Sequence, residues 1–218
     1  MSDRILVIDA GSILSPADKF LPGRVVIRNG TVETVGLLSD VRVPDGADRI
    51  DTPRLTLVPG FIDPHIHGSG GVDVMDATFA SMNKISGRLA SHGTTSFLPT
   101  TVSAPPKILE DVLDRMTPLL GQAFDGARPL GIHLEGPFIS AQKRGTHRSE
   151  NVRPPDSLLM LDWIARSRGA LKLITLAPEL KGATEITRLA GDFGLTVAMG
   201  HSDATYEEAS SAADSGTH

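Results

Sequence analysis

The feature that most limits the fold of this chain is a regular alternation of two kinds of segment after residue 57. Short apolar runs alternate with segments of helical character, and this pair occurs five times. The predicted strands lie within 57–67, 95–102, 130–135, 171–176 and 195–199, and the predicted helices span 76–91, 106–120, 157–168, 184–192 and 205–216. Such an order is typical of a parallel sheet with covering helices, and near-continuous apolar strands fit burial on both faces.

Each predicted strand ends in polar residues, which is how a (β/α)8 barrel builds its active site. These residues are His65, His67, Thr100, Thr101, Glu135, Glu179 and His201. A closed barrel needs eight such units and about 250 residues, and five strands alone would leave two open parallel edges. One interpretation is a complete, open five-stranded sheet. We favour the other, an α/β fold that forms the N-terminal part of a (β/α)8 TIM-like barrel, with about five of eight βα units.

The first part of the chain has a different character. Residues 24–28 and 31–35 are strand-like and are joined by Asn29-Gly30, which supplies the two positive-φ positions of a two-residue hairpin turn. We therefore predict a small antiparallel β unit over residues 1–57, followed by the barrel portion over residues 58–218.

The composition excludes several classes of protein. The chain has no cysteine, which rules out disulfides, thiolate chemistry and Cys-ligated zinc. Its formal net charge is -5, which gives no overall attraction to nucleic acid or to an anionic membrane. No apolar run approaches the ~20 residues of a spanning helix, and the N-terminus carries charges where a signal peptide has its apolar core. We expect a cytoplasmic protein.

Three strand ends carry side chains suited to metal binding. His65 and His67 are two residues apart, so in a strand they project to the same face, where two imidazoles can bind one ion. Glu135 ends an otherwise uncharged run and precedes a Gly-Pro turn, and His201 ends a further strand. The alternatives are ordinary surface histidines and an exposed glutamate. Histidines with a carboxylate favour Zn, Fe, Mn or Co over Ca or Mg.

The loop 143–148 brings basic residues into an acidic chain. We expect Lys143, Arg144 and Arg148 to be solvated. Thr146 and His147 suit a substrate contact instead, because they offer a hydroxyl and an imidazole beside a permissive glycine.

The remaining histidines and the large aromatic residues have structural interpretations. His92 lies at a predicted helix end, where the helix dipole stabilises a cation. We expect His133 to face the other side of its strand as a packed core histidine. Trp163 and Phe193 are predicted to pack helices against the sheet.

Several segments together give a more specific signal. Residues 59–68, PGFIDPHIHG, resemble the first-strand motif of the amidohydrolase superfamily. Four further groups of residues are similar in order and spacing to the N-acetylglucosamine-6-phosphate deacetylases of that superfamily. They are 68–73, 93–100, 133–138 with 143–147, and 177–179 with 200–205. The resemblance covers essentially the whole chain.

The resemblance implies a metal-dependent (β/α)8 barrel and a small β-sandwich built from both chain ends, with residues 1–57 as its N-terminal half. It implies that Glu135 and His201 bind the main metal, most readily zinc, and that His65 and His67 match a pair that holds a second ion in some relatives. Thr146 and His147 match a substrate-contacting loop. A homodimer is implied for the full-length form.

The implied reaction is hydrolysis of the N-acetyl amide of N-acetylglucosamine 6-phosphate to glucosamine 6-phosphate and acetate, a step of amino-sugar catabolism. The family's acid/base Asp and a third ligand would fall beyond residue 218, so we assign no catalytic residue within this chain and expect the isolated chain to be impaired. His218 matches only an earlier histidine of the family pattern and is not assigned as a ligand. The alternatives are another amidohydrolase, dihydroorotase-like or a deaminase, and a non-catalytic fragment.

Overall fold

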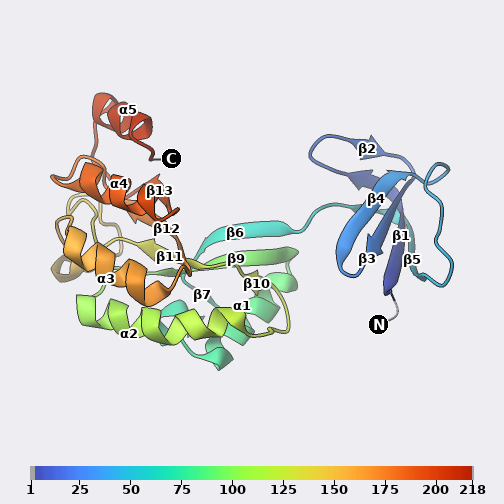
Figure 1. Cartoon of the computed structure of the whole chain (residues 1–218), viewed down its shortest axis with the longest axis horizontal. Helices are drawn as coiled ribbons and strands as arrows, with labels where there is room; N and C mark the ends of the chain where they lie inside the picture. The colour runs from blue at the N-terminus through green and yellow to red at the C-terminus, as the bar shows by residue number, and fades with distance from the viewer. Residues whose placement is uncertain (1–2, 218) are drawn as a thin grey trace. The chain divides into compact units, whose positions relative to one another are not determined.

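The computed structural model describes residues 3–217, which fall into two compact units, one ending at Gly60 and one beginning at Phe61 (Figure 1). His218 lies outside the described residues, so its relation to the metal ligands stays open. The boundary drawn on the sequence after residue 57 coincides with the end of the last strand of the first unit.

The first unit is a five-stranded sheet in the order β2-β1-β3-β4, with β5 paired to β1. Its strands are β1 (Ile5–Leu14), β2 (Lys19–Phe20), β3 (Gly23–Arg28), β4 (Thr31–Leu37) and β5 (Asp48–Leu57). The predicted hairpin is confirmed as β3–β4, with positive φ at Asn29 (52°) and Gly30 (82°). The prediction of a purely antiparallel unit is wrong, because β5 runs parallel to β1. The segment between β4 and β5 is a crossover rather than a tight turn, as a parallel pair requires.

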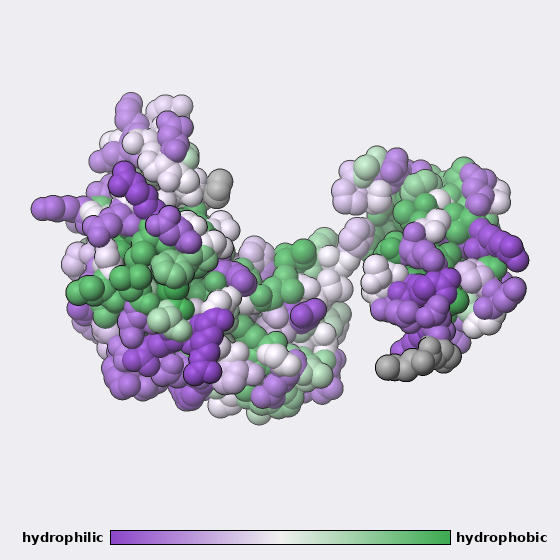
Figure 2. Space-filling view, in the orientation of Figure 1, coloured by the Kyte–Doolittle hydropathy of each residue, from purple (hydrophilic) through white to green (hydrophobic). Residues whose placement is uncertain are grey.

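Both faces of this sheet carry small apolar clusters, because neighbouring residues of a strand point to opposite faces. One cluster contains Val7, Val26 and Val41, and the other contains Ala10, Ile13 and Val25. Hydrophobic side chains also reach the surface of this unit (Figure 2).

The second unit is a parallel sheet with helices. Its main strands are β6 (Phe61–Ile66), β9 (Thr94–Thr101), β11 (Ile132–Glu135), β12 (Leu171–Leu176) and β13 (Thr196–Met199), paired in this order. Each strand is followed by one helix: α1 (Phe79–Ala90), α2 (Pro106–Met116), α3 (Ser157–Ser167), α4 (Ala183–Asp192) and α5 (Tyr206–Asp214). The five predicted βα units are therefore confirmed.

Short elements complete the second unit. The pair β7 (Gly68–Ser69) and β8 (Val72–Asp73) forms a small hairpin, and β10 (Arg128–Pro129) adds to β9. The 3-10 helices are η1 (Val74–Asp76), η2 (Thr117–Gly121) and η3 (Ser149–Asn151). Thr217 forms an isolated parallel bridge with Val197. None of the helices within residues 3–217 has the length and hydrophobicity needed to span a bilayer.

Local sequence explains where the helices begin. Thr205 and Glu208 form the predicted capping box of α5, in which each side chain accepts a backbone N–H of the other residue. Asp156 caps α3 by accepting the N–H groups of Leu158 and Leu159. These caps satisfy backbone donors that the helix itself leaves unpaired.

The core of the second unit lies between the sheet and its helices. Trp163 of α3 is fully buried, as predicted, and stacks on Phe138 with ring centroids 5.6 Å apart. The prediction for Phe193 is wrong, since 55% of this residue is exposed. Phe193 follows the last residue of α4, where the chain has already left the face that packs on the sheet.

Candidate metal centre

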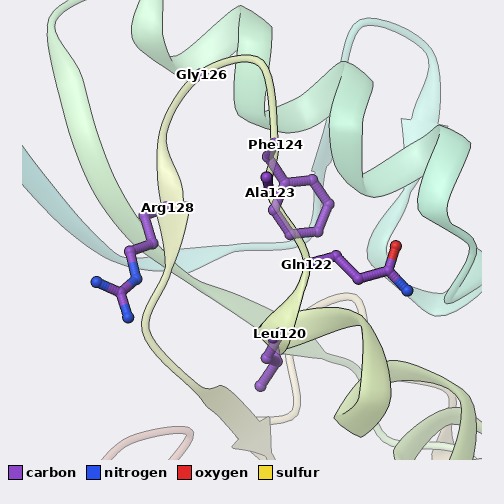
Figure 3. Close-up of a pocket in the computed structure, with 7 residues that line it drawn as sticks. Leu120, Gln122, Ala123, Phe124, Gly126 and Arg128 are labelled. Atoms are coloured by element: carbon purple, nitrogen blue, oxygen red, sulfur yellow. The ribbon is translucent and has the colours of Figure 1, made fainter. Parts of the chain in front are cut away.

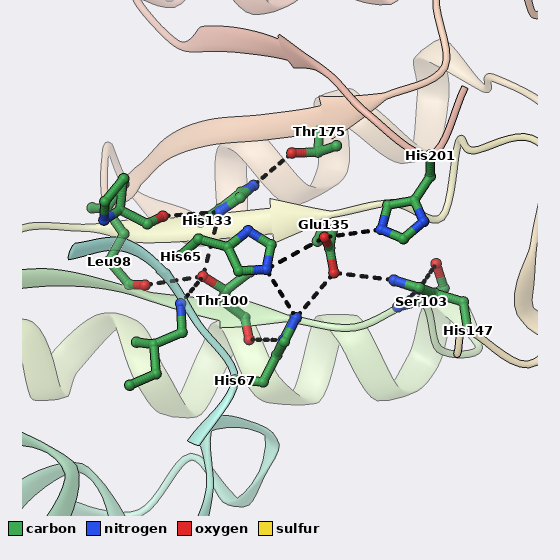
Figure 4. A network of polar contacts seen from close by, with 12 residues as sticks. His65, His67, Leu98, Thr100, Ser103, His133, Glu135, His147, Thr175 and His201 are labelled. Atoms are coloured by element: carbon green, nitrogen blue, oxygen red, sulfur yellow. Dashed lines mark hydrogen bonds and ion pairs between the residues drawn. The ribbon is translucent and has the colours of Figure 1, made fainter. Parts of the chain in front are cut away.

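The carboxyl ends of three strands bring a carboxylate and several imidazoles together (Figure 4). Glu135 is the last residue of β11, His65 and His67 lie at the end of β6, and His201 follows β13. His147 reaches the same carboxylate from the loop between β11 and α3. Parallel strands place their carboxyl ends at one edge of the sheet, and this edge holds the four residues predicted to bind metal.

Glu135 is the centre of this cluster. Its Oε1 lies 3.1 Å from Nε2 of His201 and 3.4 Å from Nε2 of His65. Its Oε2 lies 3.1 Å from Nε2 of His67 and 3.0 Å from Nε2 of His147. Burial, at 5% exposure, acts to raise the pKa of this carboxyl group, but hydrogen bonds from His147 and His67 outweigh it, so the net pKa is lowered. Glu135 is therefore ionised at neutral pH.

The partners of the Nδ1 atoms fix the tautomers of two of the imidazoles, and these tautomers suit metal binding through Nε2. Nδ1 of His67 donates to the carbonyl of Thr100 (3.1 Å), and Nδ1 of His201 donates to the carbonyl of Lys143 (3.0 Å). A carbonyl oxygen can only accept, so in the neutral ring the proton is on Nδ1 and Nε2 carries a lone pair. That lone pair faces the carboxylate of Glu135, an arrangement that requires a cation or a proton between them.

In the first donor group, His65, His67 and Glu135 each offer one ligand atom, and these atoms lie within 4.8 Å of one another. The two Nε2 atoms are 3.1 Å apart, and they lie 3.4 and 3.1 Å from the nearest oxygens of Glu135. Zn ligands at 2.0–2.1 Å in a tetrahedron are about 3.3–3.4 Å from one another. The two histidine distances are to different oxygens of Glu135, and the three residues are close enough to hold one small divalent ion.

The second donor group, Glu135, His147 and His201, differs in one member. The backbone N–H of Ser103 donates to Nδ1 of His147 at 3.1 Å. Nδ1 is thus an acceptor, and the proton of the neutral ring is on Nε2, which donates to Glu135. His147 is a hydrogen-bond donor to the carboxylate, so Glu135 and His201 are the members of this group that could bind a metal ion.

The loop 143–148 is only partly solvated. Lys143 and Arg148 are exposed, as predicted, but Arg144 is half-buried and donates to the carbonyl of His147 at 2.6 Å. Thr146 is exposed, whereas His147 is 5% exposed, and both line a surface pocket with Ser103. Their predicted contact with substrate stays a prediction.

The structure corrects the interpretation of His133. It is buried, at 2% exposure, but it lies two residues before Glu135 and so shares its face of β11. Its ring centroid is 5.1 Å from that of His65. Burial, together with the nearby His65, lowers the pKa of His133 to about 4, so the ring is neutral at pH 7. The i, i+2 spacing to Glu135 was the sequence signal that marks this face.

One further pocket lacks comparable chemistry. It lies beside η2 and β10 and is lined by Leu120, Gly121, Gln122, Ala123, Phe124, Gly126 and Arg128 (Figure 3). Arg128 is its only titratable side chain, so its lining residues offer neither an acid/base pair nor a set of metal donors. The Glu135 cluster is the better candidate for a functional site.

A comparison with protein families gives a match to the amidohydrolase family over residues 56–218. The chain belongs to this family. The match covers the whole parallel sheet and every side chain of the Glu135 cluster. Membership agrees with the groups at the strand ends that could hold a metal ion.

Curated relatives are more specific. The chain is 39% identical over 189 residues to N-acetylglucosamine-6-phosphate deacetylase of Vibrio furnissii, covering 85% of this chain and 47% of the relative. It is 35% identical over 220 residues to the enzyme of the same name from Bacillus subtilis, covering 99% and 55%. This amidohydrolase chain therefore spans about half the length of the curated relatives it matches.

A solved structure confirms the fold. A mutant N-acetyl-D-glucosamine-6-phosphate deacetylase from Mycobacterium smegmatis, in complex with N-acetyl-D-glucosamine-6-phosphate, aligns with a TM-score of 0.84 and 29% identity. The alignment covers 98% of this chain and 54% of the other. The five parallel strands correspond to part of a TIM barrel, as predicted.

Proposed function

We propose that this amidohydrolase chain belongs to a metal-dependent deacetylase that hydrolyses the N-acetyl amide of N-acetylglucosamine 6-phosphate to glucosamine 6-phosphate and acetate. The observation that carries the proposal is the convergence of imidazole nitrogens on the buried carboxylate of Glu135. Similarity to deacetylases of this specificity supports the substrate.

Each residue of the cluster has a proposed task. Glu135, His201, His65 and His67 hold one or two divalent ions, with zinc the ion that the donor set favours. A bound ion of this kind polarises an amide carbonyl and lowers the pKa of a bound water. His147 keeps Glu135 oriented through its Nε2–H, and Ser103 fixes the tautomer of His147.

The donor groups contain one carboxylate, Glu135, and a metal ligand is not free to act as a general base. We therefore propose that the acid/base group is not among the site residues within 3–217, and that the isolated chain turns over slowly. Loss of a general acid or base typically lowers the rate 10²–10⁴-fold. The cytoplasmic location and the homodimer stay predictions.

Acetate release tests the proposal directly. N-acetylglucosamine 6-phosphate is incubated with the chain and Zn²⁺, and in parallel with a chelator. An enzyme of about 10 s⁻¹ slowed by about 10⁴-fold still releases several acetates per chain each hour. We expect zinc-dependent release that is abolished in Glu135→Gln and retained in Glu185→Gln, which removes the same charge from the exposed start of α4.

Binding is measured by NMR in parallel samples that contain Co²⁺ in place of Zn²⁺. A paramagnetic Co²⁺ ion in the Glu135 cluster should broaden the acetyl methyl signal of N-acetylglucosamine 6-phosphate more than the signals of its ring protons. Less than one acetate per chain per hour, or release that Glu135→Gln leaves unchanged, would refute the proposal. Metal-dependent hydrolysis of dihydroorotate or deamination of adenosine, without acetate release, would establish the alternative amidohydrolase activities.

A further inference from the structure

The end of β6 lacks regular pairing with β9 at the point where it presents its two histidines. The register shifts between Asp63 and Ile66, so Pro64 and His65 have no ladder partners. Pro64 has no N–H to donate, and the residue opposite Ile66 is Pro99, which also has none. Backbone pairing therefore does not fix the direction of the imidazoles here.

Thr100 of β9 provides part of the missing support. Its Oγ1 accepts the N–H of Ile66 at 3.0 Å, and its carbonyl accepts Nδ1–H of His67 at 3.1 Å. Thr100 is fully buried, so its two acceptor groups are shielded from water. This one residue holds both the backbone between the two histidines and the ring of the second.

His133 of β11 provides the rest. Its Nδ1 lies 3.1 Å from the carbonyl of Pro64, which can only accept, so Nδ1 carries the proton. Its Nε2 therefore accepts, and the hydroxyl of Thr175 donates to it at 2.8 Å. Both ring nitrogens are occupied within the protein, which leaves His133 no free nitrogen for a metal. Its hydrogen bond ends on the peptide group that directly precedes His65.

We propose that His133, oriented by Thr175, is a positioning residue that aims the His65–His67 pair at Glu135. It does so by fixing the carbonyl of Pro64, in place of the absent ladder bond. His201 is held separately, because its ring donates to the carbonyl of Lys143 and its own carbonyl accepts the N–H of Ser140. Loss of His133 should therefore weaken the ion held by the first donor group and spare the one held by Glu135 and His201.

Two substitutions separate the two bonds of His133. Nδ1 of histidine is attached to Cγ, as is Nδ2 of asparagine, so His133→Asn retains a donor near the carbonyl of Pro64. The amide of glutamine is one atom further out, so His133→Gln reaches Thr175 and loses Pro64. Co²⁺ titration followed by visible absorption gives dissociation constants for Co²⁺. The ion of the first donor group is identified as the one whose binding disappears in His65→Ala. We expect the dissociation constant of this ion to rise about 10–100-fold in His133→Gln, as for other residues that orient ligands, and to stay within about threefold of wild type in His133→Asn.

Equal losses in the two variants would show that His133 acts by filling space, and an unchanged constant and spectrum in His133→Gln would remove it from the site. If His133→Gln does not fold, Thr175→Val and Thr175→Ser make the same distinction, because only the first removes the hydroxyl. Weaker binding in Thr175→Val alone supports the proposal, and equal binding overturns it. The inference rests on metal binding and needs no substrate, so its failure is distinct from a failure to release acetate.

Discussion

Substitution of Gly200 by alanine tests how closely the second unit is packed around the Glu135 cluster. Gly200 follows β13 and directly precedes His201. A Cβ at this position would lie 2.6 Å from Cγ2 of Thr175, and the only other atom within 4 Å is Cβ of the same threonine. Thr175 cannot turn its methyl group away without losing the hydroxyl bond to His133.

The magnitude follows from this single contact. Carbon atoms pack at about 3.5–4.0 Å, so the two groups must separate by about 1 Å, and overpacking of this kind costs about 1–3 kcal/mol. The smaller entropy of the unfolded alanine chain offsets about 0.4–1 kcal/mol. We expect Gly200→Ala to lower the free energy of unfolding by about 1–2 kcal/mol. Thr175→Ser removes the methyl group and keeps the hydroxyl, at a cost of about 1 kcal/mol.

The double variant Gly200→Ala/Thr175→Ser tests whether the clash with the methyl group of Thr175 causes the loss of stability. With the methyl group absent, Gly200→Ala no longer clashes, so the two substitutions should couple favourably by about 1–3 kcal/mol. Trp163 is the only tryptophan and is fully buried in the second unit, so its fluorescence during urea unfolding reports on that unit. A chelator keeps bound metal from adding to the measured stability. Additive effects, within about 0.5 kcal/mol, would refute the reasoning.

Three other predictions concern the ion pair of the first unit, the loop after β13 and the bound metal. Asp9→Asn leaves the Arg24 guanidinium buried without its carboxylate and should cost about 3–5 kcal/mol at pH 7. Hydrogen bonding from Arg24 lowers the pKa of Asp9 in the folded state. The stabilisation is therefore full above about pH 4 and is lost as the pH falls through the lowered pKa, so urea unfolding followed by circular dichroism should show a smaller difference at pH 3. The Glu179 carboxylate holds the two residues after His201 through contacts of 2.7 Å, and Glu179→Gln should raise the Co²⁺ dissociation constant about tenfold in titrations. A free metal concentration 100 times the dissociation constant should add about 2.7 kcal/mol to the free energy of unfolding of the second unit. Urea unfolding should not detect this gain in Glu135→Gln.

The fold could be predicted wherever the decisive pattern is local in the sequence. The alternation of strands and helices, the Asn29-Gly30 turn and the capping box at Thr205 each involve a few neighbouring residues, and all three are confirmed. The parallel pairing of β5 with β1 depends on where a long connection returns the chain, which no local signal encodes. Phe193 was misassigned although the predicted end of its helix at residue 192 is confirmed, because the sequence does not show which way a side chain just after a helix turns.

The site could be predicted in its composition but not in its internal roles. Position at a strand end and i, i+2 spacing indicated His65, His67, Glu135 and His201, which the structure brings together. Their binding of metal stays a prediction. The hydrogen bond of His133 to the carbonyl of Pro64 joins residues 69 positions apart. The tautomer of His147 is likewise set by the backbone N–H of a residue 44 positions away, which only the folded chain reveals.

The partners of Nδ1 explain why four imidazoles can surround one carboxylate. The tautomers of three of these rings, His67, His147 and His201, are assigned. In the neutral form, His147 donates a hydrogen bond to Glu135, whereas His67 and His201 direct a lone pair toward it. Without metal, the hydrogen bond to Glu135 raises the pKa of His67, so below that pKa a proton occupies the space between them. The stabilisation from that proton is present below the usual value of 6.5 and is lost as the pH rises through the raised pKa. A metal ion must displace the same proton. A proton and a metal ion are thus alternative ways to compensate the buried negative charge of Glu135.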